Sequence, residues 1–162
     1  MAKNPDPGLT LTTTRGIART LDDWTTMFQL FLVVLPARPE ATAYLPVARR
    51  IFATFGDSDC NCALVVTGEA EIARRMLGAD EAGELVFADP DGALVASLGL
   101  ERLPALVQIR QDTTLGTSAE GWNPTEWQRA VRQLAKVMKW TVPEVSGPGD
   151  PPRGTDWPVA LT

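Results

Sequence analysis

Two cysteines are the most reactive side chains in the sequence, and they lie two residues apart in Cys60-Asn61-Cys62. Thiols at this spacing can close a disulfide, whose small ring is strained and therefore oxidising. The alternative is structural, with one cysteine packed in the core where a strand begins and the other partly exposed. Asp57 and Asp59 favour the structural interpretation, because neighbouring carboxylates raise the pKa of a thiol and lower its reactivity.

Histidine is absent from the sequence. Its absence excludes Ser-His and Cys-His catalysis and removes the commonest general base near neutral pH. A zinc site would need both cysteines together with carboxylates, an uncommon ligand set, so we expect no metal and no cofactor. Asp89 and Asp91 could hold a cation, but the turn sequence Asp89-Pro90-Asp91-Gly92 explains both residues.

The overall composition is that of an ordinary globular domain. The chain has 162 residues, of which 44% are hydrophobic and 22% charged. Its net charge of −5 argues against nucleic acid as a partner, because that role needs clustered Lys and Arg. Arg49 and Arg50 are expected on a solvated helix face. A membrane-spanning helix needs about 20 consecutive apolar residues, and no segment approaches this length. The first residues lack the apolar core of a signal peptide. We therefore expect an acidic, cytoplasmic protein with reduced thiols.

Apolar patterns predict the elements that position these residues. The almost wholly apolar run at 28–35 predicts a strand covered on both faces. Apolar side chains at helical spacing predict a helix over 41–55, ending at Gly56. Further strands are expected at 63–66, 85–88, 105–109 and 114–117, and further helices at 69–77 and 93–98.

The last predicted helix has a well-marked start. Asn123 can cap it, Pro124 occupies the first helical position, and Glu126 can complete a capping box. Alternation of strands and helices gives parallel strand pairs, and the hairpin before this helix adds antiparallel ones. The fold class is therefore α/β, with a mixed central sheet, helices on both faces and a C-terminal helix.

The chain divides into three parts by composition. Residues 1–17 are expected to form a flexible N-terminal arm, and residues 18–142 the domain. Residues 143–162 are dense in Pro and Gly and are expected to form an irregular tail. Trp157 is unusual in a purely solvated tail, so it either packs back on the domain or contacts a partner.

The order of elements resembles the thioredoxin-like superfamily, and the segment after the first buried strand supports the resemblance. Aligned without gaps, Pro46 falls on the proline of the family's active-site helix, and Arg38-Pro39-Glu40-Ala41 falls on the CxxC positions. The extra strand and helix before Asp89 are similar to the layout of peroxiredoxins and TlpA-type proteins. Over residues 20–140 the resemblance implies a three-layer α/β/α sandwich.

A second segment, GLERLPALV at residues 99–107, is similar to the family's proline segment. The resemblance implies a cis peptide bond before Pro104 and a groove between Pro104 and residues 38–41. In thioredoxin-like proteins such a groove exposes a strand edge suited to an extended peptide.

Residues 38–41 contain no sulfur, whereas thiol–disulfide exchange needs an attacking thiolate and a resolving sulfur. We therefore expect a redox-inactive thioredoxin-like protein with a cysteine-less active site, and not an enzyme. It would bind a protein or an extended peptide as an assembly or chaperone-type factor. The residues expected to line its groove are Arg38, Pro39, Glu40, Leu103 and Pro104.

Two alternatives remain open. One is a thiol oxidoreductase or peroxide reductase that works through Cys60 and Cys62. The other is an accessory subunit of a larger complex, tethered by its tail around Trp157.

Overall fold

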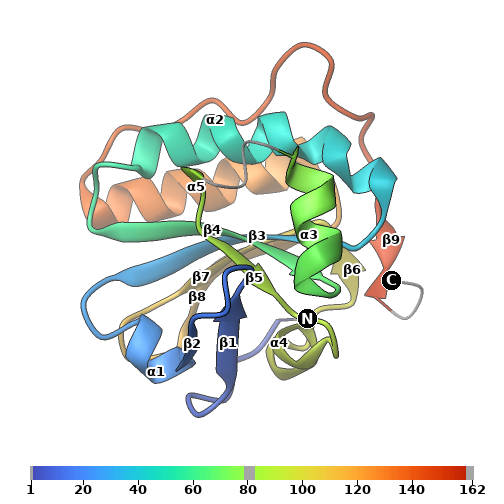
Figure 1. Ribbon diagram of the computed structural model, residues 1–162. Coiled ribbons are helices and arrows are strands. Elements are labelled where there is room, and N and C mark those ends of the chain that lie inside the picture. The colour runs from blue at the N-terminus through green and yellow to red at the C-terminus, as the bar shows by residue number, and fades with distance from the viewer. Residues whose placement is uncertain (1, 79–82, 160–162) are drawn as a thin grey trace.

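The computed structural model describes residues 2–78 and 83–159, which form three layers around a central sheet (Figure 1). Within these residues the sheet has seven strands in the order β2-β1-β5-β4-β3-β7-β8. β3 pairs in parallel with β4 and antiparallel with β7, which confirms the mixed sheet. The strands are β1 (Thr10–Thr13), β2 (Ala18–Thr20), β3 (Gln29–Pro36), β4 (Cys60–Thr67), β5 (Val86–Ala88), β7 (Ala105–Ile109) and β8 (Leu115–Glu120).

Helices cover both faces of the sheet, as the sequence predicts (Figure 1). One face carries α2 (Leu45–Phe55), α3 (Ala70–Leu77) and α5 (Pro124–Met138). The other carries α1 (Leu21–Trp24) and α4 (Ala93–Leu98). None of the described helices is long and apolar enough to cross a membrane.

The central strand β3 explains why two separate cores form. All side chains at residues 30–36 are buried, and alternate ones point to opposite faces of the sheet. Phe31, Val33 and Leu35 pack with α2 and α5, whereas Leu30, Leu32 and Val34 pack with α1 and α4. An uninterrupted apolar sequence is therefore what a strand covered on both sides requires.

The helix expected over 41–55 is divided in the structure. A 3-10 segment, η1 (Pro39–Tyr44), leads from β3 to α2, which begins only at Leu45. Pro46 lacks the N–H that would bond to Thr42 in a continuous α-helix, and a proline fits in the first turn of a new one.

The two ends of the chain are more ordered than the sequence suggests. Residues 1–17, expected as a flexible arm, contain β1, which pairs with β5 through Thr12 and Ala88. After α5 the tail runs back over the outside of α2 and α5 (Figure 1). It ends beside the domain in a separate two-stranded sheet of β6 (Arg102–Leu103) and β9 (Trp157–Pro158). Residues 160–162 of the expected tail lie outside the described residues.

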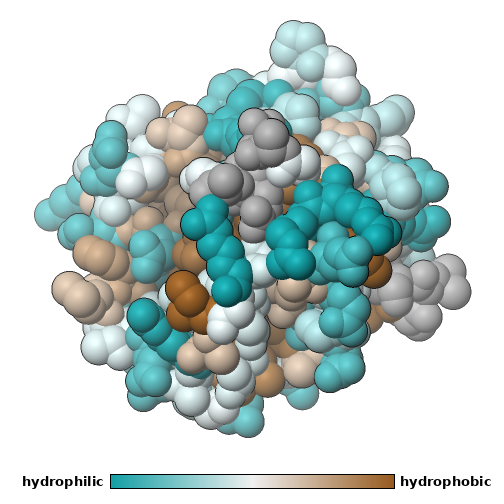
Figure 2. Space-filling model, in the orientation of Figure 1, coloured by the Kyte–Doolittle hydropathy of each residue, from teal (hydrophilic) through white to brown (hydrophobic). Residues whose placement is uncertain are grey.

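The face of the molecule seen in Figure 2 is chemically mixed. Hydrophilic residues dominate it, and its hydrophobic residues form small, separated spots. This view therefore shows no extended hydrophobic surface that would indicate a binding site. The candidate site is located instead from the reactive side chains.

Candidate functional site

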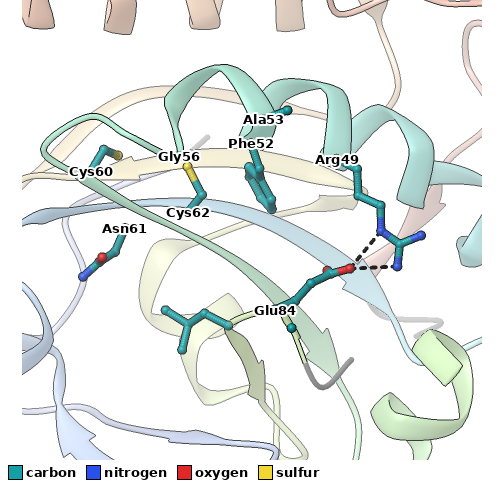
Figure 3. A pocket seen from close by; sticks show the side chains of 10 residues that line it. Arg49, Phe52, Ala53, Gly56, Cys60, Asn61, Cys62 and Glu84 are labelled. Atoms are coloured by element: carbon teal, nitrogen blue, oxygen red, sulfur yellow. Dashed lines mark hydrogen bonds and ion pairs between the residues drawn. The ribbon is translucent and has the colours of Figure 1, made fainter. Parts of the chain in front are cut away.

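The cysteines lie at the beginning of β4, earlier than the strand expected at 63–66. Cys60 pairs in register with Gln29 and Cys62 with Phe31, so both belong to the regular part of the parallel β3–β4 ladder. Because strand side chains alternate, the two sulfurs lie on the same face of the sheet and Asn61 points to the other. Figure 3 shows both sulfurs on the side that faces α2.

The cysteines border a cavity of about 400 Å³ between β4 and α2 (Figure 3). Arg49, Phe52 and Gly56 of α2 form one wall. Glu84 closes the opposite side and accepts a hydrogen bond of 2.9 Å from Arg49 Nε. Both thiols are free, with Cys60 only 5% exposed and Cys62 partly exposed. The cavity therefore combines sulfur, an aromatic ring and an ion pair.

The two thiols influence each other electrostatically. The pKa of Cys60 is raised far above its usual value, first by a hydrogen bond to Cys62, then by burial and by the charge of Cys62. The expected carboxylates, Asp57 and Asp59, are not among the causes. Cys60 therefore holds its proton more firmly than an ordinary thiol, and Cys62 is the more exposed of the two sulfurs.

Strand geometry allows this pair to close only with local adjustment. Two residues of a strand span about 6.6 Å, near the upper limit of about 6.8 Å between the Cα atoms of a disulfide. The beginning of β4 pairs with β3 on one side, but β5 pairs only with residues 64–66 on the other. Because no strand of the described residues lies beside this edge of residues 60–62, the segment can pucker without disrupting a second described ladder.

The groove residues expected from the resemblance lie at the opposite end of the sheet, after β3. The Leu103–Pro104 bond is cis, which confirms that part of the resemblance. Arg38 and Glu40 form an ion pair at 3.6 Å, and Pro39 begins η1. The groove between these residues and its binding role both stay predictions.

Trp157 of the tail joins these groove residues. It pairs in register with Leu103 across the β6–β9 sheet, and the Arg38 guanidinium lies 4.9 Å from the centre of its ring. Of the two possibilities for this residue, the structure therefore has Trp157 packed back on the domain.

The turn at Asp89 has a structural role. The Asp89 carboxylate accepts hydrogen bonds from the backbone N–H groups of Leu94 and Val95 at 3.1 and 3.3 Å, which caps α4. Burial raises its pKa, against the opposing effect of these bonds. The turn explanation for Asp89 is thereby confirmed.

Sequence reasoning missed the α2 side of the dithiol cavity. Arg49 was expected on a solvated face, yet it pairs with Glu84, 35 positions away in the sequence. Arg50, expected on the same solvated face, is only 29% exposed and pairs with Asp150 of the tail. The one available indication was local: Arg49 and Phe52 lie one helical turn apart, before the Gly56 that precedes the cysteines.

Comparison with known proteins identifies the fold. No protein-family model and no curated protein matches the sequence. A solved disulfide oxidoreductase from Mycobacterium tuberculosis, homologous to E. coli DsbE, is 19% identical with a TM-score of 0.59, covering 79% of this chain and 96% of that one. Peroxidoxin BcpB from M. tuberculosis is 15% identical with a TM-score of 0.61, covering 85% and 99%. Peroxiredoxin Q from Xanthomonas campestris is 13% identical with a TM-score of 0.62, covering 80% and 90%.

These findings correct the expected function. The redox-inactive protein with a cysteine-less active site, inferred from residues 38–41, was wrong. Its structural neighbours are thiol-disulfide oxidoreductases and peroxiredoxins, and the chain has two free cysteines side by side at a cavity. The turn at residues 38–41 lacks sulfur, but Cys60 and Cys62 lie elsewhere in the same domain. The order of its strands and helices, its cis-proline and its structural neighbours show that the chain has the thioredoxin-like fold.

Proposed function

We propose that the protein is a thiol–disulfide oxidoreductase in which Cys62 is the nucleophile and Cys60 the resolving thiol. The observation that carries the proposal is the placement of both sulfurs on the cavity side of β4. The solved neighbours named as a disulfide oxidoreductase and as peroxiredoxins support thiol chemistry on this fold. In this chain the chemistry lies at the opposite end of the sheet from residues 38–41.

The two cysteines differ in the properties that their roles require. Cys62 is the more exposed, so a substrate reaches it first. Cys60 is buried and its raised pKa keeps it protonated while Cys62 reacts. A buried thiol beside an attacking one is well placed to resolve a mixed disulfide.

The reaction follows from these roles. The Cys62 thiolate attacks one sulfur of a substrate disulfide, the substrate S–S bond breaks, and the departing thiolate takes a proton from solvent. Cys60 then loses its proton to solvent and attacks the Cys62 sulfur. The mixed disulfide breaks, the second substrate thiolate leaves, and a Cys60–Cys62 disulfide remains. The substrate gains two electrons and the protein loses two.

The cavity suits a low-molecular-weight disulfide. Its volume of about 400 Å³ lies within the range of small-ligand sites. Phe52 offers apolar contact, and the Arg49–Glu84 pair offers hydrogen bonds at the opposite side. Oxidised glutathione is therefore a suitable probe of this site.

Trapping the mixed disulfide tests the proposal. Wild-type protein, Cys60→Ser and Cys62→Ser are incubated with oxidised glutathione, quenched with an alkylating agent and weighed by mass spectrometry. We expect an internal disulfide in the wild type and a glutathione adduct that persists on Cys62 in Cys60→Ser. Cys62→Ser should react at least about tenfold more slowly, because its remaining thiol, Cys60, is only 5% exposed.

Asn61→Ala is the matched control, because Asn61 borders the same cavity between the cysteines but its side chain points away from α2. Its rate should stay within about twofold of the wild type. If the wild type keeps both thiols free and Cys60→Ser forms no adduct, the proposal is wrong.

Peroxide reduction uses the same residues with a different electrophile. The Cys62 thiolate would attack one peroxide oxygen, the O–O bond would break and hydroxide would leave, giving a sulfenic acid on Cys62. Cys60 would then condense with it to a disulfide and release water. Comparing the oxidation rate with hydrogen peroxide against that with oxidised glutathione separates the two reactions. A protein partner and a cytoplasmic location stay predictions.

A further inference from the structure

The last described segment of the tail, residues 154–159, lies where the resemblance implies a groove: Trp157 pairs with Leu103, and the Arg38 guanidinium lies over its ring. Within the described residues, β6 has one strand partner, and it is β9 of this segment. The pairing is extended by Val159, whose N–H donates to the Glu101 carbonyl at 2.8 Å. The chain thus covers its own strand edge beside the cis-proline. We call residues 154–159 the latch.

Side chains of the domain hold the latch in one register. The Asp156 carboxylate accepts hydrogen bonds from Arg102 Nε and, at 3.0 Å, from the backbone N–H of Trp122. On the other side of the latch, the Tyr44 hydroxyl donates to the Thr155 carbonyl. A carboxylate and a backbone carbonyl are thereby recognised by specific donors.

Aromatic contacts complete the site. The ring of Trp157 packs edge-to-face against Tyr44, with 6.0 Å between centroids, under the Arg38 guanidinium. Tyr44 in turn packs against Trp122, which is buried. Such aromatic pairs stabilise a contact beyond the effect of buried area alone. The site therefore selects an acidic residue followed by an aromatic one in an extended backbone.

The latch contains no fully buried residue, in contrast to the part of the tail before it. Val145 is fully buried, and Asp150 pairs with Arg50 at 2.6 Å. In the latch, by contrast, Trp157 is only partly buried and the Arg102 side chain of its ion pair is 47% exposed. Segments with few buried contacts open locally at a small fraction of the global free energy of unfolding.

A hinge lies between the two parts. Gly154 has a φ of +86°, a backbone conformation that glycine adopts without strain. Residues 152–155 are exposed, and rotation at this point breaks one backbone hydrogen bond to the domain, from the Gly154 N–H to the Trp122 carbonyl at 2.8 Å. The upstream anchor at Val145 and Asp150 keeps an opened latch close to its site, at a high effective concentration.

We propose that the latch is an internal ligand that closes this groove and opens as a unit about Gly154. In the closed form it blocks the β6 edge. In the open form the same site accepts an extended segment in trans that carries the Asp-Trp-Pro sequence of the latch. The latch is separate from the dithiol site. Phe31, which pairs with Cys62, lies five positions before Pro36 at the end of β3, and five strand residues span about 16 Å.

Competition with a labelled peptide of residues 153–159 tests the latch in the full chain. Trp157→Ala removes the central contact of the internal ligand but leaves the groove intact. We expect this variant to bind the peptide at least about tenfold more tightly than the wild type, because the intramolecular competitor is weakened. The same peptide with alanine in place of tryptophan should bind neither protein.

Trp140→Ala is the matched control, because this tryptophan also follows α5 but donates to the Thr54 carbonyl on α2, away from the latch. It should bind the peptide as weakly as the wild type. If Trp157→Ala does not fold, Asp156→Asn carries the same expectation. Equal affinity of wild type and latch variant, or no binding to either, would overturn the proposal. So would a concentration-dependent dimer with exchanged tails in light scattering, because the latch would then act between chains.

Discussion

Arg50 should be a main anchor of the tail, and its removal gives a quantitative test of the structure. Arg50 Nη2 donates to both carboxylate oxygens of Asp150 at 2.6 and 2.7 Å. Its Nε and Nη2 also donate to the Val145 carbonyl at 3.2 and 2.8 Å. One guanidinium therefore holds two positions of the tail against α2.

The expected magnitude follows from the exposure of this pair. Exposed ion pairs contribute about 0–1 kcal/mol, whereas hydrogen bonds to charged groups contribute about 1.5–3 kcal/mol. The Asp150 side chain is 12% exposed, so a carboxylate without Arg50 loses much of its hydration as well as its partner. We expect Arg50→Ala to lower the free energy of unfolding by about 2–3 kcal/mol.

Urea denaturation followed by tryptophan fluorescence measures this change. Arg75→Ala is the control, because Arg75 forms an i,i+4 pair with Glu71 in which both side chains are largely exposed. The control should lose less than about 0.5 kcal/mol. A double-mutant cycle of Arg50→Ala with Asp150→Asn should show coupling of about 1–2 kcal/mol. An Arg50 variant as stable as the Arg75 variant would refute this account of the tail.

Three further outcomes test other parts of the structure. Asp89→Ala should lower the free energy of unfolding by about 1–2 kcal/mol in urea, because α4 loses its capping carboxylate, whereas exposed Asp91 should tolerate alanine. Folding raises the pKa of Cys60, so the unfolded chain releases this proton first. Stability should therefore fall as pH rises above about 8.5, by up to about 1.4 kcal/mol per unit, and Cys60→Ala should flatten that slope. Phe55→Ala should lower the free energy of unfolding by about 3–5 kcal/mol in thermal or urea unfolding, because Phe55 is fully buried. Phe52→Ala should lower it less, because Phe52 is only partly buried.

The elements with local physical causes could be predicted from the sequence. The strand expected at 28–35 is β3, whose apolar run reflects burial on both faces. The last helix begins where Asn123 accepts hydrogen bonds from Thr125 and Glu126, as its capping residues predict. Both features depend on residues that are neighbours in the chain, so a short window of sequence contains their causes.

The candidate sites depend on contacts between distant residues, and these were not predictable in the same way. The two-residue pairing of β6 with β9 joins Leu103 to Trp157, and no periodicity marks so short a strand. Arg49 on α2 and Glu84 before β5 are 35 positions apart in the sequence, and only the folded sheet brings them into contact. The functional error had a different cause, because the chemistry of the domain was judged from one turn.

The two ends of β3 separate the features of greatest chemical interest. The dithiol lies beside its beginning, and the groove closed by the latch follows its end. A molecule bound in one place therefore leaves the other sterically accessible, and each can be engineered alone. A designer could place two cysteines in the turn at 38–41 while retaining Cys60 and Cys62, which would give one small domain two separate thiol pairs at opposite ends of the sheet.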